Sequence, residues 1–460
     1  MDSISKLSKI SYVSLTFPSS AAAMPIVVYI LPFYADNLGL GLSIVGLIFF
    51  IGRMLDVITD PFMGYLIDKY PSRWGKHKHW IAISIPFLMV AIYLIYLPNQ
   101  SLVTPTYLFF SLFLAYLGFT LLVVTQLSWS VVLAPSYDER TRLLTAREFV
   151  SLISMLIIIA LPAIIEIYTS NMESKIQSIG ITSLLIIPLI VIAALILVPD
   201  KKDAVIERAK VPVQEMIRTV LFDKALSRLV FANLFLAFSQ SLFGALSIIV
   251  FNTIFELPEY SARATLLYFI MGAVGLFYFR SLSLRTSKHF SASACLAYGA
   301  IIILLAWIIS PYVIGTQYSV YLLFAFTFFY GLSFAGATPL IMAMVGDVSE
   351  MQEKKSGYSK SGAVYAYVTT IAKVGFSLAA AIPYIVLETF IGFEVSLGAN
   401  NSEFSKTVLW NIYMLVPFFG YALAGLMIYF HPHSREAVNC LLYTSPSPRD
   451  VEESRMPSSA

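Results

Sequence analysis

Cysteine and charge are both scarce in this chain of 460 residues, and each shortage limits what the protein can be. Cys295 and Cys440 are its two cysteines, too few for a disulfide framework or a cysteine-ligated metal cluster. Charged residues make up only 12% of the chain, hydrophobic residues make up 58%, and the mean hydropathy is +0.79. A soluble domain of this length does not need so much apolar surface, so the composition indicates a polytopic membrane protein with no nucleic-acid partner.

Apolar segments of helix length recur along the whole chain and predict twelve transmembrane helices. The segments cover approximately residues 11–35, 41–67, 79–98, 105–133, 146–168, 178–198, 227–251, 261–280, 290–310, 317–346, 361–389 and 407–430. The predicted fold class is therefore an all-α membrane protein.

Lysine and arginine are distributed unevenly around these segments. Of the 30 Lys and Arg residues, all but five lie in the two tails, in the loops on the same side as the tails, or at the margins of those loops. The exceptions are Lys175, Arg263, Lys406, Arg53 and Lys373. Because basic residues concentrate on the cytoplasmic side, we expect both termini to be cytoplasmic in a multi-pass protein of a bacterial inner (plasma) membrane.

A polar stretch from Pro199 to Arg228 separates the sixth and seventh predicted helices. It predicts a six-helix half at 1–198, a cytoplasmic linker at 199–226, a second six-helix half at 227–430 and a cytoplasmic tail at 431–460. From about residue 440 the tail reads as an artefactual scar, and it carries no functional argument. Two halves of this kind are typical of transporters, whose substrate site lies between the repeats near the membrane centre.

An acid pair lies inside the second predicted helix, which contains the run Gly52-Arg53-Met54-Leu55-Asp56-Val57-Ile58-Thr59-Asp60-Pro61. Asp56 and Asp60 are spaced i and i+4, so they share a helix face and lie roughly 6 Å apart. Carboxylates in hydrocarbon are costly, and two neighbours repel unless one takes a proton or both share a cation. We therefore assign Asp56, Thr59 and Asp60 to a cation site; neutralisation by Arg53 alone is the alternative.

A polar stripe follows one face of the eleventh predicted helix. Tyr365, Thr369, Lys373 and Ser377 are spaced by four residues. Lys373 lies too deep to reach the interface easily, so it requires an acidic partner, and Asp56 or Asp60 is the expected one. The stripe predicts that Tyr365, Thr369 and Lys373 line a solute cavity, although a purely structural Lys–carboxylate pair stays open as the alternative.

Further solute candidates come from three other predicted helices. Thr125 and Trp129 share a face of the fourth helix, where a Trp beside a hydroxyl suits stacking on a sugar ring. Arg147, at the start of the fifth helix, is either a solute donor or an interfacial anchor. Gln240 on the seventh is a further solute candidate. Ordinary packing of Trp129 and interhelical hydrogen bonding by Gln240 are the alternatives.

Charged residues at or near the cytoplasmic ends of the helices, together with Arg53 inside the second helix, are candidates for a gate. Ion pairs that form in only one conformation bias an alternating-access equilibrium. The gating candidates are Arg53, Asp68, Arg73, Asp138, Arg140, Arg142 and Asp347.

The run from Gly52 to Asp68, followed by Ser72-Arg73-Trp74-Gly75-Lys76, resembles the glycoside–pentoside–hexuronide:cation symporters of the major facilitator superfamily. The resemblance covers nearly the whole chain. It implies the major facilitator architecture, with Asp56 and Asp60 as coupling-cation carboxylates. It also places Trp129, Arg147 and Lys373 around a sugar cavity.

Two positions depart from that family's pattern. The acid expected four residues before Trp129 is Thr125, and the first helix carries Ser19 and Ser20 where another acidic sugar ligand is expected. The loss of two acids, with Arg147 and Lys373 retained, favours an anionic or less hydroxylated solute over a galactoside.

The sequence therefore predicts a monomeric secondary symporter, not an enzyme, that imports a sugar, glycoside or uronate with Na⁺ or H⁺ and without a cofactor. A lysolipid or organic-anion transporter of the same fold is the alternative. An intramembrane prenyltransferase-type enzyme is a remote one, because the sequence lacks a second Asp-rich motif for magnesium diphosphate.

Overall fold

The computed structural model describes residues 5–70, 72–134, 137–200, 223–356 and 361–432, with the exception of residue 23. Within these ranges, the side chains of residues 21, 22, 61, 68, 131, 137, 138, 140, 141, 352–356 and 361–363 are not described. The predicted linker at 201–222 and the predicted tail from 433 lie outside the described residues.

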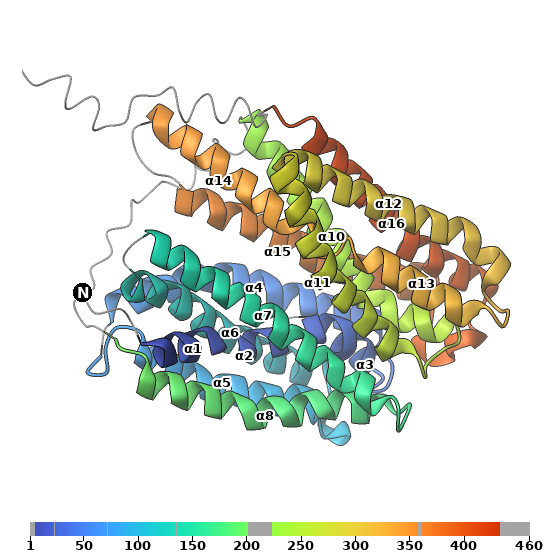
Figure 1. Ribbon diagram of the computed structural model, residues 1–460. Helices are drawn as coiled ribbons and strands as arrows, with labels where there is room; N and C mark the ends of the chain where they lie inside the picture. The colour runs from blue at the N-terminus through green and yellow to red at the C-terminus, as the bar shows by residue number, and fades with distance from the viewer. Residues whose placement is uncertain are drawn as a thin grey trace, which may run out of the picture.

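The described chain is helical and forms two bundles that lie side by side (Figure 1). The N-terminal bundle contains α1 (Lys6–Ser14), α2 (Phe17–Ala22), η1 (Ile26–Ile30), α3 (Leu31–Ala35), α4 (Leu42–Lys69), α5 (Lys78–Tyr96), η2 (Gln100–Leu102), α6 (Pro105–Leu133), α7 (Tyr137–Ile165) and α8 (Met172–Leu197). The C-terminal bundle contains α10 (Lys224–Thr253), α11 (Ser261–Arg285), α12 (Lys288–Val313), α13 (Ser319–Gly331), α14 (Ala337–Ser356), α15 (Ser361–Ile385), η3 (Val386–Phe390), η4 (Val395–Asn400) and α16 (Glu403–Tyr429).

The predicted membrane fold is confirmed, but two of the predicted spans are not continuous helices. Among the described residues, ten helices are long and apolar enough to cross a membrane. The predicted span 11–35 is divided into α1, α2, η1 and α3, and the predicted span 317–346 is divided into α13 and α14.

Proline accounts for much of this division. Pro18, Pro25 and Pro32 each lack the backbone N–H that continues an α-helix, and all three lie in the first broken span. Pro339 lies in the first turn of α14, where a proline removes no helical hydrogen bond. Transporter sites are commonly built where helices are interrupted, because the break frees backbone groups to face a cavity.

Two helix pairs make most of the contact between the bundles: α4 packs against α15, and α7 packs against α11. Both pairs pass through the centre of the molecule (Figure 1). In addition, α10 packs against η1 and α3. We call the end of the molecule where α1 begins and α16 ends the terminal face, and the opposite end the far face. The junction of α4 with α15 brings the acid pair against the C-terminal bundle.

Candidate functional site

Asp56 and Asp60 of α4 meet Lys373 of α15 at the centre of the molecule. Lys373 Nζ lies 3.0 Å from Asp56 Oδ2 and 2.5 Å from Asp60 Oδ2. The side chain of Asp56 is fully buried, whereas those of Asp60 and Lys373 are 33% and 26% exposed. The expected pairing across the two bundles is present, and one ammonium group contacts both acids.

Thr120 of α6 completes the contacts of the two acids. Its hydroxyl lies 2.6 Å from Asp56 Oδ1 and 3.0 Å from Asp60 Oδ1. The hydroxyl of Thr59, which was predicted to take part, instead donates to the carbonyl of Asp56 in its own helix at 3.2 Å. Thr120 was missed, although its i, i+4 spacing from Tyr116 forms the same kind of polar stripe that identified α15.

Arg53 is held beside the acid pair by two aromatic rings. Its guanidinium lies 3.3 Å from Asp56 Oδ2, 5.2 Å from the ring centre of Tyr116 and 5.5 Å from that of Phe376. Gly52 makes this approach possible, because a Cβ there would lie 2.9 Å from a carbon of the Tyr116 ring. Arg53 was predicted as a gating residue, and the structure places it in the central cluster.

The central cluster of Arg53, Asp56, Asp60, Thr120 and Lys373 therefore combines two acids with two bases. Its formal charge is zero when all four groups are ionised. A buried charge is tolerated when it is paired and hydrogen-bonded, and Asp56 meets both conditions. Each of the four carboxylate oxygens already contacts Arg53, Thr120 or Lys373.

A cavity of about 270 Å³ opens beside the cluster. The residues that line it are Arg53, Asn233, Ala237, Gln240, Thr338, Met342, Thr369, Ala372, Lys373 and Phe376. Three of the predicted solute residues, Gln240, Thr369 and Lys373, are thus brought together around one space.

The cavity lies beside the start of α14, which follows the break after α13. Gln240 of α10 donates from Nε2 to the carbonyl of Phe334, in the break, at 2.6 Å. Thr369 donates to the carbonyls of Tyr365 and Ala366, both at 2.9 Å, and the hydroxyl of Tyr365 lies 3.1 Å from the carbonyl of Met342. α14 and α15 therefore form two walls of one cavity, but Tyr365, which was predicted to line it, is not among the residues around it.

The structure does not bring Trp129 into this cavity. Trp129 is fully buried, its indole N–H donates to the carbonyl of Pro199 at 3.2 Å, and its ring stacks on His77 at 5.9 Å. In this conformation Trp129 is therefore packed in the protein interior, which was the alternative to stacking on a sugar ring. Thr125, on the same helix, is also fully buried, and its hydroxyl has no partner among the described residues.

His77 also takes part in a latch at the terminal face that the sequence did not indicate. Asp200, after α8, accepts from the backbone N–H groups of His77 and Lys78 at 2.6 and 3.0 Å and lies 2.9 Å from His77 Nδ1. Burial by itself would raise the pKa of Asp200, but the hydrogen bonds from His77 and Lys78 outweigh burial and lower that pKa.

Arg147 belongs to a network within the N-terminal bundle. Its Nε lies 3.1 Å from Gln126 Oε1, and it pairs with Glu148. Gln126 in turn donates to the carbonyl of Tyr12 at 2.8 Å. Arg147 therefore joins α7 to α6 and α1, and it does not line the central cavity.

The predicted gating charges other than Arg53 lie towards the terminal face. Asp347 pairs with Lys288 of its own bundle at 2.7 Å. Arg73 and Arg142 are exposed. The side chains of Asp68, Asp138 and Arg140 lie outside the described residues.

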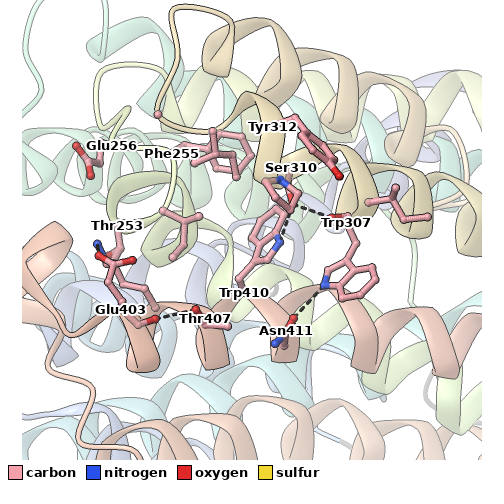
Figure 2. A pocket seen from close by; sticks show the side chains of 16 residues that line it. Thr253, Phe255, Glu256, Trp307, Ser310, Tyr312, Glu403, Thr407, Trp410 and Asn411 are labelled. Carbon is pink, nitrogen blue, oxygen red and sulfur yellow. Dashed lines mark hydrogen bonds and ion pairs between the residues drawn. The ribbon is translucent and has the colours of Figure 1, made fainter.

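A larger cavity, of about 780 Å³, lies away from this chemistry, between the far ends of α10, α12 and α16 (Figure 2). Its two tryptophans already use their N–H groups, since Trp307 donates to Asn411 at 2.9 Å and Trp410 donates to Ser310 at 3.0 Å. Lys406 on its wall pairs with Glu403 at 2.6 Å. None of the residues around it belongs to the central cluster, so size alone does not identify the functional site.

Comparison with known proteins agrees with this architecture. Residues 11–435 match a family described as MFS/sugar transport protein. An isoprimeverose transporter of Lactiplantibacillus pentosus is 22% identical over 92% of this chain and 88% of its own length. YagG of Escherichia coli (strain K12), whose name describes a glycoside/cation symporter, is 23% identical over 86% of this chain and 85% of its own. The solved structure of the nucleoside transporter NupG superposes with a TM-score of 0.63 at 12% identity, over 94% of this chain and 100% of NupG.

Proposed function

Because the chain belongs to the MFS/sugar transport protein family, we propose that it is a symporter that imports a small organic solute together with Na⁺ or H⁺. The family makes it a multi-pass membrane transporter and not an enzyme. The proposed solute class is a sugar, glycoside or uronate.

The contact of Lys373 with both Asp56 and Asp60 carries this proposal. Carboxylate and hydroxyl oxygens are the ligands that hard cations prefer, and Asp56, Asp60 and Thr120 present them at one point. In this conformation the Lys373 ammonium takes the place of the coupling cation. A Na⁺ ion or a proton that neutralises the acids would release Lys373.

Release of Lys373 supplies the coupling between cation and solute. The freed ammonium lies on the wall of the cavity beside Gln240 and Thr369, where it can donate hydrogen bonds to a solute. A bound solute holds Lys373 away from the acids and so favours the cation; the two ligands raise each other's affinity by the same factor. Without either ligand, the neutral cluster lets the empty carrier return.

The cavity chemistry favours an oxygen-rich or anionic solute. Arg53 and Lys373 are both on its wall, with Asn233 and Gln240 as neutral partners. In the N-terminal bundle, the hydroxyls of Ser19 and Thr125 are buried without a partner among the described residues, as expected of groups that complete their hydrogen bonds with a ligand or water in another conformation. A uronate is both anionic and rich in oxygen, so it could pair with the two basic side chains and accept hydrogen bonds from the hydroxyls. The roles of Trp129 and Arg147 in such a conformation remain predictions.

The same proposal places the terminal face in the cytoplasm. The distribution of Lys and Arg supports this orientation in a bacterial inner membrane. We propose that a single copy transports by alternating access, with the division into halves at 1–198 and 227–430 and with the gating charges on the cytoplasmic side.

Solute counterflow in proteoliposomes tests the proposal. Wild type and Asp60→Asn are compared over a panel of neutral glycosides, uronates, organic anions and a lysolipid, with and without Na⁺ and at two pH values. We expect wild-type counterflow of a glycoside or uronate to respond to one cation, and Asp60→Asn to lose that response. Transport that is unchanged in Asp60→Asn and indifferent to both ions would contradict the coupling. Counterflow of the lysolipid alone would establish the alternative transporter.

A further inference from the structure

α4 and α11, which begin at the far face, lack a capping side chain of their own. The N-cap residue of α4 is Gly41, and that of α11 is Tyr260; neither caps its helix with a side-chain hydrogen bond. The first N–H groups of a helix have no partner within the helix, and the positive end of the helix dipole favours a carboxylate there. Both helices therefore need an acceptor from elsewhere in the molecule.

The acceptor for α4 comes from the opposite bundle. Glu388 of η3, in the C-terminal bundle, accepts a hydrogen bond from the backbone N–H of Ser43 at 2.5 Å. The hydroxyls of Ser43 and Thr389 lie 3.1 Å apart beside it. Gly41 allows this approach, because a Cβ at that position would collide with the carboxylate of Glu388.

The acceptor for α11 also comes from the opposite bundle, in the reverse direction. Glu166, after α7, accepts from the backbone N–H groups of Ala262 and Arg263 at 2.8 and 2.9 Å and from the Ser261 hydroxyl at 3.3 Å. Lys175 pairs with it at 2.6 Å, and both side chains are almost fully buried. These contacts give Glu166 a specific partner in the other bundle.

The two contacts repeat one design. Each bundle contributes one helix start that is capped from the other bundle, and one acid that caps. Glu388 follows α15, which packs against α4, and Glu166 follows α7, which packs against α11. In order along the two halves, α4 corresponds to α11 and α7 corresponds to α15, so the two caps occupy equivalent positions in the repeat.

We propose that Glu166 and Glu388 are paired gating residues that hold the far face closed by capping, each from its own bundle, a helix of the other bundle. This rests on the proposed function, because alternating access is what requires the two bundles to separate at this face. When they separate, both carboxylates leave the helix starts together, and the exposed N–H groups bind water instead. Both caps therefore favour the closed state of the same opening equilibrium at the far face. Removal of both should raise the opening equilibrium constant by the product of the two single effects.

Thiol labelling from the far side tests the proposal without any solute. The probe is the substitution Ser247→Cys in a Cys295→Ser, Cys440→Ser background. Ser247 is 1% exposed and lines a small cavity between the bundles with Val28 and Thr265. A membrane-impermeant maleimide is applied from outside, and its rate of reaction reports how often the far face opens.

We expect Glu388→Gln and Glu166→Gln each to raise the labelling rate about tenfold, which corresponds to about 1.4 kcal/mol, and the double variant to raise it about a hundredfold. Glu173→Gln is the matched control. Glu173 is an acid of the same face, but its hydrogen bonds go to Gln100 and Gln177 of its own bundle. Labelling that is equal in the control and in both gate variants would overturn the proposal.

A cross-link supplies a test that removes neither acid, in case Glu166→Gln fails to fold. The pair Ser43→Cys and Thr389→Cys, added to the labelling background, should form a disulfide that keeps the far face closed. We expect oxidation to stop counterflow and to protect the thiol introduced at position 247, and reduction to restore both transport and labelling. Cross-linked protein that labels at the uncross-linked rate would refute the gate. Loss of cation dependence in counterflow would bear on the proposed function alone, because labelling requires neither cation nor solute.

Discussion

Replacement of Lys373 by Gln should separate two roles of the central cluster, cation binding and the coupling of cation to solute. The substitution removes the ammonium that lies 3.0 Å from Asp56 and 2.5 Å from Asp60 and keeps a side chain of similar length. The cluster then holds two acids and only Arg53, so its formal charge changes from zero to minus one. A cation that enters the variant no longer has to displace Lys373, and we expect its affinity to rise.

The size of the rise follows from the contacts. At an effective dielectric of about 20, unit charges 3.0 Å apart attract by roughly 5–6 kcal/mol. Desolvation offsets most of this, and a hydrogen bond to a charged group contributes about 1.5–3 kcal/mol net. Because Asp60 and Lys373 are 33% and 26% exposed, solvent screens the pair, and we take the lower end, a rise of about tenfold in cation affinity.

Cation binding to purified protein provides the assay. Na⁺ binding is followed by isothermal titration, and proton uptake is followed with an indicator dye, so that either coupling ion is detected. Lys406→Gln serves as the control, since Lys406 pairs with Glu403 outside the central cluster. We expect the Lys373 variant to bind its cation more tightly but to lose coupled solute uptake. A cation affinity that is unchanged or weaker in Lys373→Gln would refute the idea that Lys373 competes for the acids.

Three further substitutions test separate parts of the structure. Thr120→Val removes a hydroxyl shared by both acids and should lower cation affinity about tenfold, whereas Thr120→Ser should retain it; equal binding by both would contradict a role for the hydroxyl. Gly52→Ala places a Cβ against the ring of Tyr116 and should destabilise the protein by about 1–3 kcal/mol, measured as a lower melting temperature in detergent. Asp200→Asn weakens the latch on His77 and should lower stability at neutral pH. Because folding lowers the pKa of Asp200, its contribution is present above the carboxyl's ordinary pKa of about 3.9 and is lost as the pH falls through the lower, folded value. The melting temperatures of wild type and Asp200→Asn should therefore converge in acid, and a constant difference would count against the latch.

The sequence predicted much of the fold because membrane helices are largely specified by local composition. Long apolar segments cannot be left in water, and ten of the twelve segments predicted from hydropathy are helices long and apolar enough to cross a membrane. The breaks after α1 and between α13 and α14 were missed, because an apolar segment with prolines reads the same whether it spans the membrane as one helix or as several pieces. The i, i+4 rule also located Asp56, Asp60 and Lys373, since that rule depends only on helix geometry.

Which residues meet across the molecule was decided by tertiary packing. Lys373 and Asp56 are 317 positions apart, and Lys373 contacts both acids only because α15 packs against α4. The same packing selected Thr120 over Thr59, buried Trp129 against His77, and gave Glu166 and Glu388 their helix starts. The sequence by itself determined a helical membrane protein with two acids and a lysine inside its predicted spans, because the cost of a charge in hydrocarbon depends on the residue. The tertiary structure alone decided which groups neutralise those charges and which helices close the far face, because these contacts depend on how separate helices approach one another.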